Sequence, residues 1–446
     1  MSDNTGLSAH IDHSPMTRFQ VNAIAVCLII NMMDGFDVLV VAFTAPSIAA
    51  DWGLSSTAIG SLLSAGLVGM TLGSLLIGPL ADRFGRRPLV LACLVVISAG
   101  MVASAFTQSV NQLLLMRLVT GLGIGGILPS LNTIVSEFSS LRWRSFAVSC
   151  LQAGYPIGAT VGGVLAALLI GIYGWRAVYL SAGLASTVMI AIVWRQLPES
   201  MDYLLHRRPS GALDKVNHLL SKIGRPTVDA LPAVEAQAVA QKTGYADLWA
   251  TPALRVTTLV LSVAFFIVML SFYFVLSWTP KILVDAGMST TQGISGGIIL
   301  NLGGIVGSVL LGYISSRWAI SKLIAVYMVV TAVLMLLFAN VSSFNITTLT
   351  LALALGFFIF GSMVGLYALS PHLYPARSRA AGLSIAIGVG RIGGVTSPLV
   401  AGYLFDHGWA QQDGFMVFAV PLLVSMVAVL VLGRSLQAPR VASAGA

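Results

Sequence analysis

Residues 78–88 read GPLADRFGRRP, a short charged stretch between two long apolar ones, 57–80 and 88–107. Glycines permit a tight turn and close helix packing. The charged residues of the stretch are Asp82, Arg83, Arg86 and Arg87. The acid can form a charge-assisted contact with these bases that breaks when helices shift. Alternatively, the stretch is an ordinary basic loop at a membrane surface. Either interpretation predicts two membrane-spanning helices joined by a charged turn.

The two apolar neighbours of this loop belong to a series that runs along all 446 residues. The chain is 57% hydrophobic and only 9% charged, whereas soluble domains carry roughly 25% charged residues. Stretches near 20 residues can cross a hydrocarbon core about 30 Å thick. We predict twelve spans: 21–49, 57–80, 88–107, 111–137, 146–172, 176–196, 254–280, 291–315, 321–340, 346–370, 381–404 and 413–433. The expected fold class is therefore an all-α membrane protein.

The net charge of +8 raises the question of nucleic-acid binding, and the positions of the bases answer it. If both termini are cytoplasmic, only Arg176 and Lys281 of the 24 Lys and Arg residues fall at outer ends. Arg117 and Arg391 lie within spans, and the other 20 (24 − 4 = 20) face the cytoplasm. This is the positive-inside distribution of a plasma-membrane or inner-membrane protein. It predicts contact with the lipid bilayer and no nucleic-acid partner.

The spans form two copies of one unit. DWGLSST at 51–57 matches DAGMSTT at 285–291, and the offset is 234 residues (285 − 51 = 234). The same offset joins Gly78 to Gly312 and the Gly-Trp pair at 174–175 to the one at 408–409. Parallel six-span halves are a transporter arrangement. The expected organisation is an N-terminal bundle, a cytoplasmic connector with one or two short amphipathic helices, and a C-terminal bundle, at 1–196, 197–252 and 253–446.

Two acids interrupt the first apolar stretch at MMDGFDVLVV, residues 32–41. Asp34 and Asp37 are three residues apart and share one helix face. Each charge at mid-bilayer costs about 2.5–3.5 kcal/mol, and such acids are functional candidates by default. We predict that one of the pair carries a proton, and we slightly favour Asp34 because it is nearer a helix break expected at Gly35. The alternative is a structural pair, with one acid neutralised by Arg117 and the other capping that break.

Two arginines lie inside spans. RLVTGLGIGG at 117–126 contains G-x-G-x-x-G, but a dinucleotide fingerprint needs a strand before it, so we reject that interpretation. Arg117 either extends to the outer surface or is buried with a function, and we favour the second. Arg391 lies about ten residues into its span, about 15 Å at 1.5 Å per residue. No span of the second half supplies an acid away from its ends, so a bound anion is its expected partner. Aromatic residues such as Tyr273 and Tyr367 fit an aromatic substrate.

The stretch 78–88 resembles the signature of the major facilitator superfamily, and so do residues 117–126, LPESMDYL at 197–204 and HLYPARSRAAG at 372–382. The resemblance implies a latch at the cytoplasmic mouth. Its expected members are Asp82, Arg83, Arg86, Arg87, Glu199, Arg377 and Arg379. Within it, Glu199 would pair with Arg377 or Arg379. The chain departs from the family pattern at two positions, with Ser316 and His372 in place of acids.

DGFD in the first span and GVGRIGG in the eleventh resemble the aromatic acid:H+ symporter family within that superfamily. This resemblance implies import of a small aromatic carboxylate, such as a hydroxybenzoate, together with protons. A proton-coupled exporter and an importer of another organic anion, such as a muconate-like diacid, remain alternatives. An enzyme is not expected, because neither a nucleophile elbow nor His/Cys/Asp metal spacing occurs. We expect a monomer without cofactor or metal.

Overall fold

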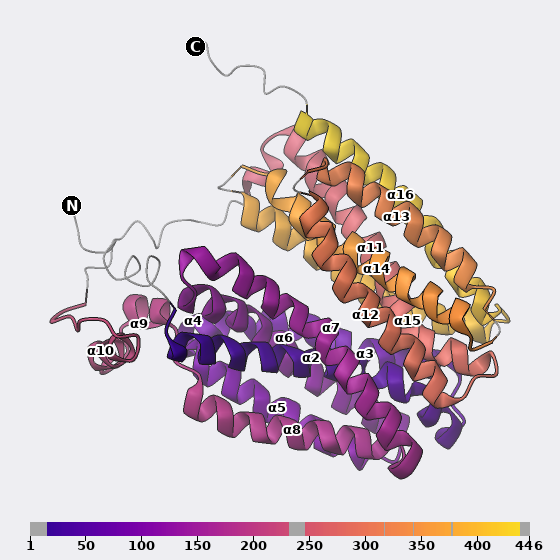
Figure 1. The fold of residues 1–446 in the computed structure, drawn as a ribbon, viewed down its shortest axis with the longest axis horizontal. Coiled ribbons are helices and arrows are strands. Elements are labelled where there is room, and N and C mark those ends of the chain that lie inside the picture. Colours follow the sequence, from indigo (N-terminus) through magenta and orange to yellow (C-terminus); the bar gives the residue numbers. More distant parts are fainter. Residues whose placement is uncertain (1–15, 232–245, 316, 342, 376–377, 438–446) are drawn as a thin grey trace. The chain divides into compact units, whose positions relative to one another are not determined.

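The structure is a computed structural model that describes residues 16–231, 246–315, 317–341, 343–375 and 378–437. The described residues contain helices and connecting turns, without strands (Figure 1). The first half holds α2 Arg18–Trp52, α3 Ser56–Leu76, η1 Gly78–Leu80, α4 Ala81–Phe84, α5 Arg86–Ala105, α6 Val110–Phe138, α7 Leu141–Tyr173 and α8 Trp175–Gln196. The second half holds α11 Pro252–Asp285, α12 Thr290–Ser315, α13 Ile320–Phe338, α14 Ile346–Leu369, η4 Ser370–His372, α15 Arg379–Asp406 and α16 Gln411–Gln437.

Twelve helices of the described residues are long and apolar enough to span a membrane, which confirms the predicted twelve spans. Many large apolar side chains of these helices are exposed, as expected for helices that face lipid. Ile172 and Leu75 are 72% and 67% exposed, and Val309 of the second half is 67% exposed. Lipid is as apolar as these side chains, so their exposure carries no penalty there. The chain is a multi-pass membrane protein.

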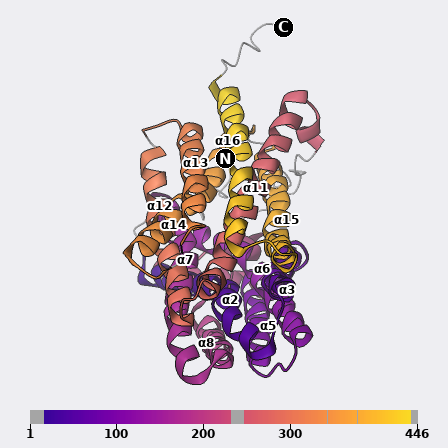
Figure 2. The ribbon, with the colours of Figure 1, turned by 90° about the vertical axis from the view of Figure 1, so that its right-hand side faces the viewer.

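The chain divides into two compact units, Met1–Val40 with Ala65–Ala240 and Val41–Ser64 with Gln241–Ala446. The boundary passes through α2 and α3. In unit 1, α5 packs against both α6 and α8 (Figure 1). In unit 2, α11 packs against α15 and α16, and α12 packs against α14. Figure 2 shows α11, α13 and α16 of that unit running side by side.

Helix register repeats at the offset found in the sequence. Helix α2 begins at Arg18 and α11 at Pro252 (252 − 18 = 234), and α3 and α12 begin at residues 56 and 290. Glycines with positive φ recur at the same spacing, Gly53 with Gly287 and Gly174 with Gly408. Only glycine adopts this conformation without strain. The repeated turns therefore explain why the two copies keep these glycines, and the two halves of the chain are pseudo-symmetric six-helix bundles.

The central segment contains two short helices in its described part, α9 Met201–Arg207 and α10 Ala212–Lys222, followed by the 3₁₀ turn η3 Ala246–Trp249. Helix α10 buries one apolar face, at Ala212, Val216, Leu219 and Leu220, and exposes its charged residues. This agrees with the expected amphipathic connector. Residues 232–245 lie outside the described part of the chain.

Candidate functional site

The two acids of α2 are buried inside unit 1. Asp34 is 2% exposed and Asp37 is 1% exposed. The Oδ2 atom of each carboxylate is buried without a hydrogen-bond partner among the described residues. A buried polar atom normally has a partner, and a buried charge normally has a counter-ion. Two buried carboxylates on one helix face, each with an oxygen that lacks a partner, therefore mark a candidate functional site.

The predicted helix break at Gly35 is wrong, because α2 continues as one helix from Arg18 to Trp52. The glycine serves a different purpose. A Cβ atom at Gly35 would lie 2.0 Å from the backbone oxygen of Tyr155 on α7. Close approach of the two backbones excludes any side chain there. Because α2 has no break at Gly35, proximity to that residue does not distinguish Asp34 from Asp37 as the proton carrier.

A stripe of glycines on α7 creates this close approach. Gly154, Gly158 and Gly162 are four residues apart and lie on one helix face. A Cβ at Gly158 would lie 1.7 Å from the backbone oxygen of Met32, and Asn31 Nδ2 donates to Leu151 O at 2.5 Å. Small residues every fourth position are the usual means of tight helix packing in membranes. The stripe lets the acid-bearing helix pack closely against α7.

Arg117 of α6 is buried with the acids and is only 1% exposed. Its Nη2 donates to the backbone oxygen of Asp37 at 2.6 Å, and its Nη1 lies 3.1 Å from Met101 Sδ. Its Nε has no partner among the described residues. The side chain thus points into unit 1 and does not extend to a membrane surface. It contacts the acid pair through a main-chain carbonyl, which leaves the Asp37 carboxylate available for other chemistry.

Arg391 of α15 is half-buried in unit 2. A Cβ at Gly394, three residues along α15, would lie 2.7 Å from the Tyr273 ring of α11, and the Tyr367 ring of α14 packs against Phe265 of α11. Within the described residues, Arg391 forms no ion pair with a carboxylate. The nearby rings pack edge to face, with centroids 5.2 Å apart for Phe265 and Tyr367 and 5.4 Å apart for Phe272 and Tyr273. The structure therefore brings together a guanidinium and the aromatic residues that the sequence singled out.

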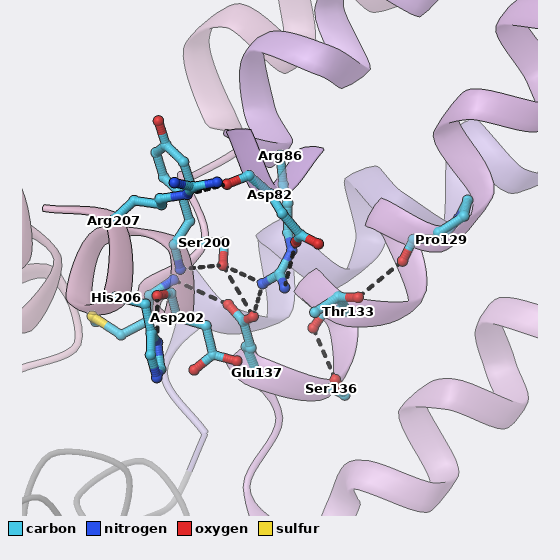
Figure 3. Close-up of polar contacts among 12 residues, drawn as sticks. Asp82, Arg86, Pro129, Thr133, Ser136, Glu137, Ser200, Asp202, His206 and Arg207 are labelled. Atoms are coloured by element: carbon cyan, nitrogen blue, oxygen red, sulfur yellow. Dashed lines mark hydrogen bonds and ion pairs between the residues drawn. The ribbon is translucent and has the colours of Figure 1, made fainter. Parts of the chain in front are cut away.

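In the region of the predicted latch, the polar contacts centre on Glu137 rather than on Asp82. Arg86 Nη1 donates to Glu137 Oε1, and Ser200 Oγ donates to the same oxygen at 3.0 Å (Figure 3). Met201 N donates to the other oxygen of Glu137 at 3.0 Å. By contrast, the side chain of Asp82 is 79% exposed and its carboxylate lies 4.0 Å from Arg86. Glu137 joins α6 to the turn before α9, and the sequence interpretation overlooked it.

The other latch residues divide into three groups. Glu199 Oε1 accepts the backbone N–H groups of Arg86 at 2.9 Å and of Arg87 at 3.2 Å, so it caps the start of α5. Arg83 lies over the Phe84 ring at 5.3 Å. Arg377 lies outside the described residues, and Arg379 begins α15 in unit 2 with an exposed side chain. Pairing of Glu199 with Arg377 or Arg379 stays a prediction.

Comparison with known proteins places the chain in a family. Residues 27–386 match the model of the Major Facilitator Superfamily. The chain is 30% identical over 425 residues to a gallate transporter of Pseudomonas putida, covering 95% of this chain and 94% of that protein. It is 30% identical over 431 residues to the 4-hydroxybenzoate transporter PcaK of the same species, covering 96% and 95%.

The fold also matches a solved transporter. The inward-open structure of the xylose transporter XylE from E. coli superimposes with a TM-score of 0.74 at 18% identity, covering 92% of this chain and 96% of that one. This likeness supports the fold alone. The family match and the full-length relatives show that the chain is a secondary transporter rather than an enzyme, and that it belongs to the Major Facilitator Superfamily.

Proposed function

We propose that this protein imports a small aromatic carboxylate by proton symport with alternating access. The observation that carries the proposal is the pair of buried carboxylates on α2, each with an oxygen that lacks a partner. Keeping such a pair in a membrane span costs free energy. Proton coupling accounts for such a pair, because binding a proton removes the charge of a buried carboxylate.

Asp34 and Asp37 are the proposed proton site. Arg117 donates to the carbonyl of Asp37 at 2.6 Å and so fixes the helix without forming a closed ion pair with a carboxylate. Two like charges three residues apart disfavour each other, so the pair holds one proton more readily than none. Uptake then requires that a proton reach the pair from the side on which substrate binds. One acid of the pair carries the coupled proton, and the charge of its neighbour sets how readily that proton is held.

Arg391 is the proposed substrate anchor, with Tyr273 and Tyr367 beside it. A guanidinium holds a carboxylate through two parallel hydrogen bonds, which an ammonium group cannot do. Aromatic rings prefer edge-to-face partners, so the exposed ring of Tyr367 offers a wall for a phenyl ring, and the fully buried Phe265 packs behind it. Arg117 is the second candidate for the anion because its Nε has no partner. The substrates named for the gallate and 4-hydroxybenzoate relatives fit this chemistry.

Orientation follows from the distribution of bases. We propose that both termini and the central segment face the cytoplasm, with the protein in the cell's inner (plasma) membrane. Reporter fusions after Gly211 and after Ala446 should both report a cytoplasmic location. A reporter fused after Gly408, in the turn between α15 and α16, should report the opposite side. An outside signal from either of the first two would overturn the orientation.

Transport in proteoliposomes distinguishes the candidate functions. With labelled 4-hydroxybenzoate outside, an acidic exterior should drive accumulation, and a protonophore should abolish it, because the proton is a co-substrate. A proton-coupled exporter would instead accumulate substrate when the interior is the acidic side. Competition by unlabelled cis,cis-muconate, compared with benzoate and gallate, tests the diacid alternative. Equal accumulation with and without a proton gradient would refute symport.

A further inference from the structure

A cavity of about 740 Å³ lies in unit 1 at the end of the bundle that carries α9 and α10. It is formed by the first turn of α2, the start of α5, the last turn of α8 and the two short helices of the central segment. None of its lining residues belongs to the acid pair or to the Arg391 cluster. Small-molecule sites usually have volumes of about 300–1,000 Å³, so the cavity is large enough for a ligand.

The cavity opens where unit 1 leaves the membrane. Trp194, in the last turn of α8, lines it and is 66% exposed, and Phe84, before α5, lines it and is 55% exposed. Exposed tryptophan at the end of a span is typical of the interface between hydrocarbon and headgroups. Much of the remaining wall is apolar. A ligand of this cavity therefore meets both an apolar surface and the headgroup layer.

The charge that lines the cavity is mainly positive. Four cations, Arg87, Arg195, Lys215 and Lys222, face two acids, Glu199 and Asp214. The carboxylate of Glu199 already accepts three backbone N–H groups, from residues 86, 87 and 200. In the described part of the chain, none of Arg195, Lys215 and Lys222 forms an ion pair with an acid. The cavity thus has a surplus of positive charge without a protein counter-ion.

Helix α10 presents its bases on one face. Lys215, His218 and Lys222 are three and four residues apart, so they lie together, opposite the buried Val216 and Leu220. Lys222 Nζ lies 5.3 Å from the centre of the Phe19 ring, which joins α10 to the start of α2. Such a contact holds the amphipathic helix at the bundle end. Lys215, His218 and Lys222 of this helix line the same cavity as Trp194.

We propose that this cavity binds the phosphate headgroup of an anionic phospholipid from the adjacent leaflet. Clusters of Lys and Arg beside a membrane span attract anionic lipids, and basic pockets at helix ends hold their headgroups. The apolar walls at the membrane boundary favour a lipid over a fully soluble anion, because acyl chains can cover them. The inference is independent of the transported substrate and of the direction of transport.

The test compares lipids in the full-length protein. The protein is reconstituted into nanodiscs of phosphatidylcholine alone or with 20 mol% phosphatidylglycerol (about one lipid in five), and its melting temperature is measured. Inorganic phosphate and glycerol 3-phosphate added to phosphatidylcholine nanodiscs test the soluble source of the same chemistry. The test variant is K215Q/K222Q. The matched control is R142Q/K322Q, which removes the same charge from exposed positions outside the cavity.

Phosphatidylglycerol should raise the melting temperature of the native chain and of R142Q/K322Q, and the increase should fall by more than half in K215Q/K222Q. Arg195→Gln, at the exposed end of α8, should also reduce it and serves if the double variant does not fold. An equal increase in all variants would refute the site, because it would reflect membrane charge alone. Equal protection by glycerol 3-phosphate or inorganic phosphate would refute the assignment to a lipid.

Discussion

The acid pair of unit 1 and the arginine cluster of unit 2 differ at every functional position, although the helices that carry them repeat in register. At the offset of 234 residues, Val268 is the equivalent of Asp34, Ser271 is the equivalent of Asp37, and Ile157 is the equivalent of Arg391. Val268 is fully buried in an apolar setting, and Ser271 Oγ donates to Phe418 O at 2.7 Å. A shared architecture thus carries different chemistry in its two copies.

The difference in burial is equally informative. The acids are almost inaccessible, at 2% and 1% exposure, whereas Arg391 is half-buried and Tyr367 is 36% exposed. A proton needs little room to reach a carboxylate, but a substrate needs an open approach to its anchor. The comparison therefore supports a division in which unit 1 handles the proton and unit 2 the organic anion. The predictions below test this division.

The largest expected effect is on coupling. Asp34→Asn or Asp37→Asn should abolish accumulation of substrate against a gradient, since an amide mimics a carboxyl group that never releases its proton. Exchange of labelled for unlabelled substrate should persist in the variant that replaces the proton carrier. Ser271→Ala, at the matching position of unit 2, should leave proton-driven accumulation intact. If both acid variants still accumulated substrate under a proton gradient, the division would fail on its proton side.

The second prediction concerns affinity. Arg391→Ala should weaken binding of an aromatic carboxylate by about 2 kcal/mol or more, roughly thirtyfold in Kd, because a charged group would lose its partner. Arg391→Lys should weaken it less, since a point charge remains. Equilibrium binding of labelled 4-hydroxybenzoate measures both. Native affinity in both variants would move the anchor elsewhere, with Arg117 as the next candidate and Arg117→Lys as its test.

The third prediction concerns the latch in unit 1. Glu137→Gln should lower stability by about 1–3 kcal/mol, because an amide cannot satisfy Arg86, Ser200 and the Met201 N–H together. Asp82→Asn should change stability by less than about 1 kcal/mol, as its pair with Arg86 is exposed. Both variants should slow transport while substrate binding is retained. Thermal melting separates them, and an equal loss of stability in both would contradict the central place given to Glu137.

The apolar composition and the 234-residue repeat made the fold predictable from the sequence, whereas parts of the candidate site could not be predicted. Twelve apolar stretches and one offset require only local patterns, and the acids of α2 stand out because charge is rare in spans. The role of Gly35 depends on a tertiary contact with Tyr155, and no pattern within α2 reports it. The role of Glu137 was equally hidden from local patterns. It is a single acid at a helix end, and its partners Arg86 and Ser200 are 51 and 63 residues away in the sequence.

The last prediction compares two glycines, one in each unit. A Cβ at Gly158 would lie 1.7 Å from the Met32 backbone oxygen, so Gly158→Ala must push α7 away from α2 and should destabilise the protein by about 1–3 kcal/mol. A Cβ at Gly388 of α15 would meet nothing within 4 Å. Gly388→Ala should therefore stabilise by up to about 1 kcal/mol, the gain in helix propensity alone. Thermal melting of the two variants in the same detergent measures both. A loss of stability in Gly388→Ala as large as that in Gly158→Ala would mean that the face of α15 at Gly388 is closely packed, and the open approach to Arg391 on that face would have to be abandoned.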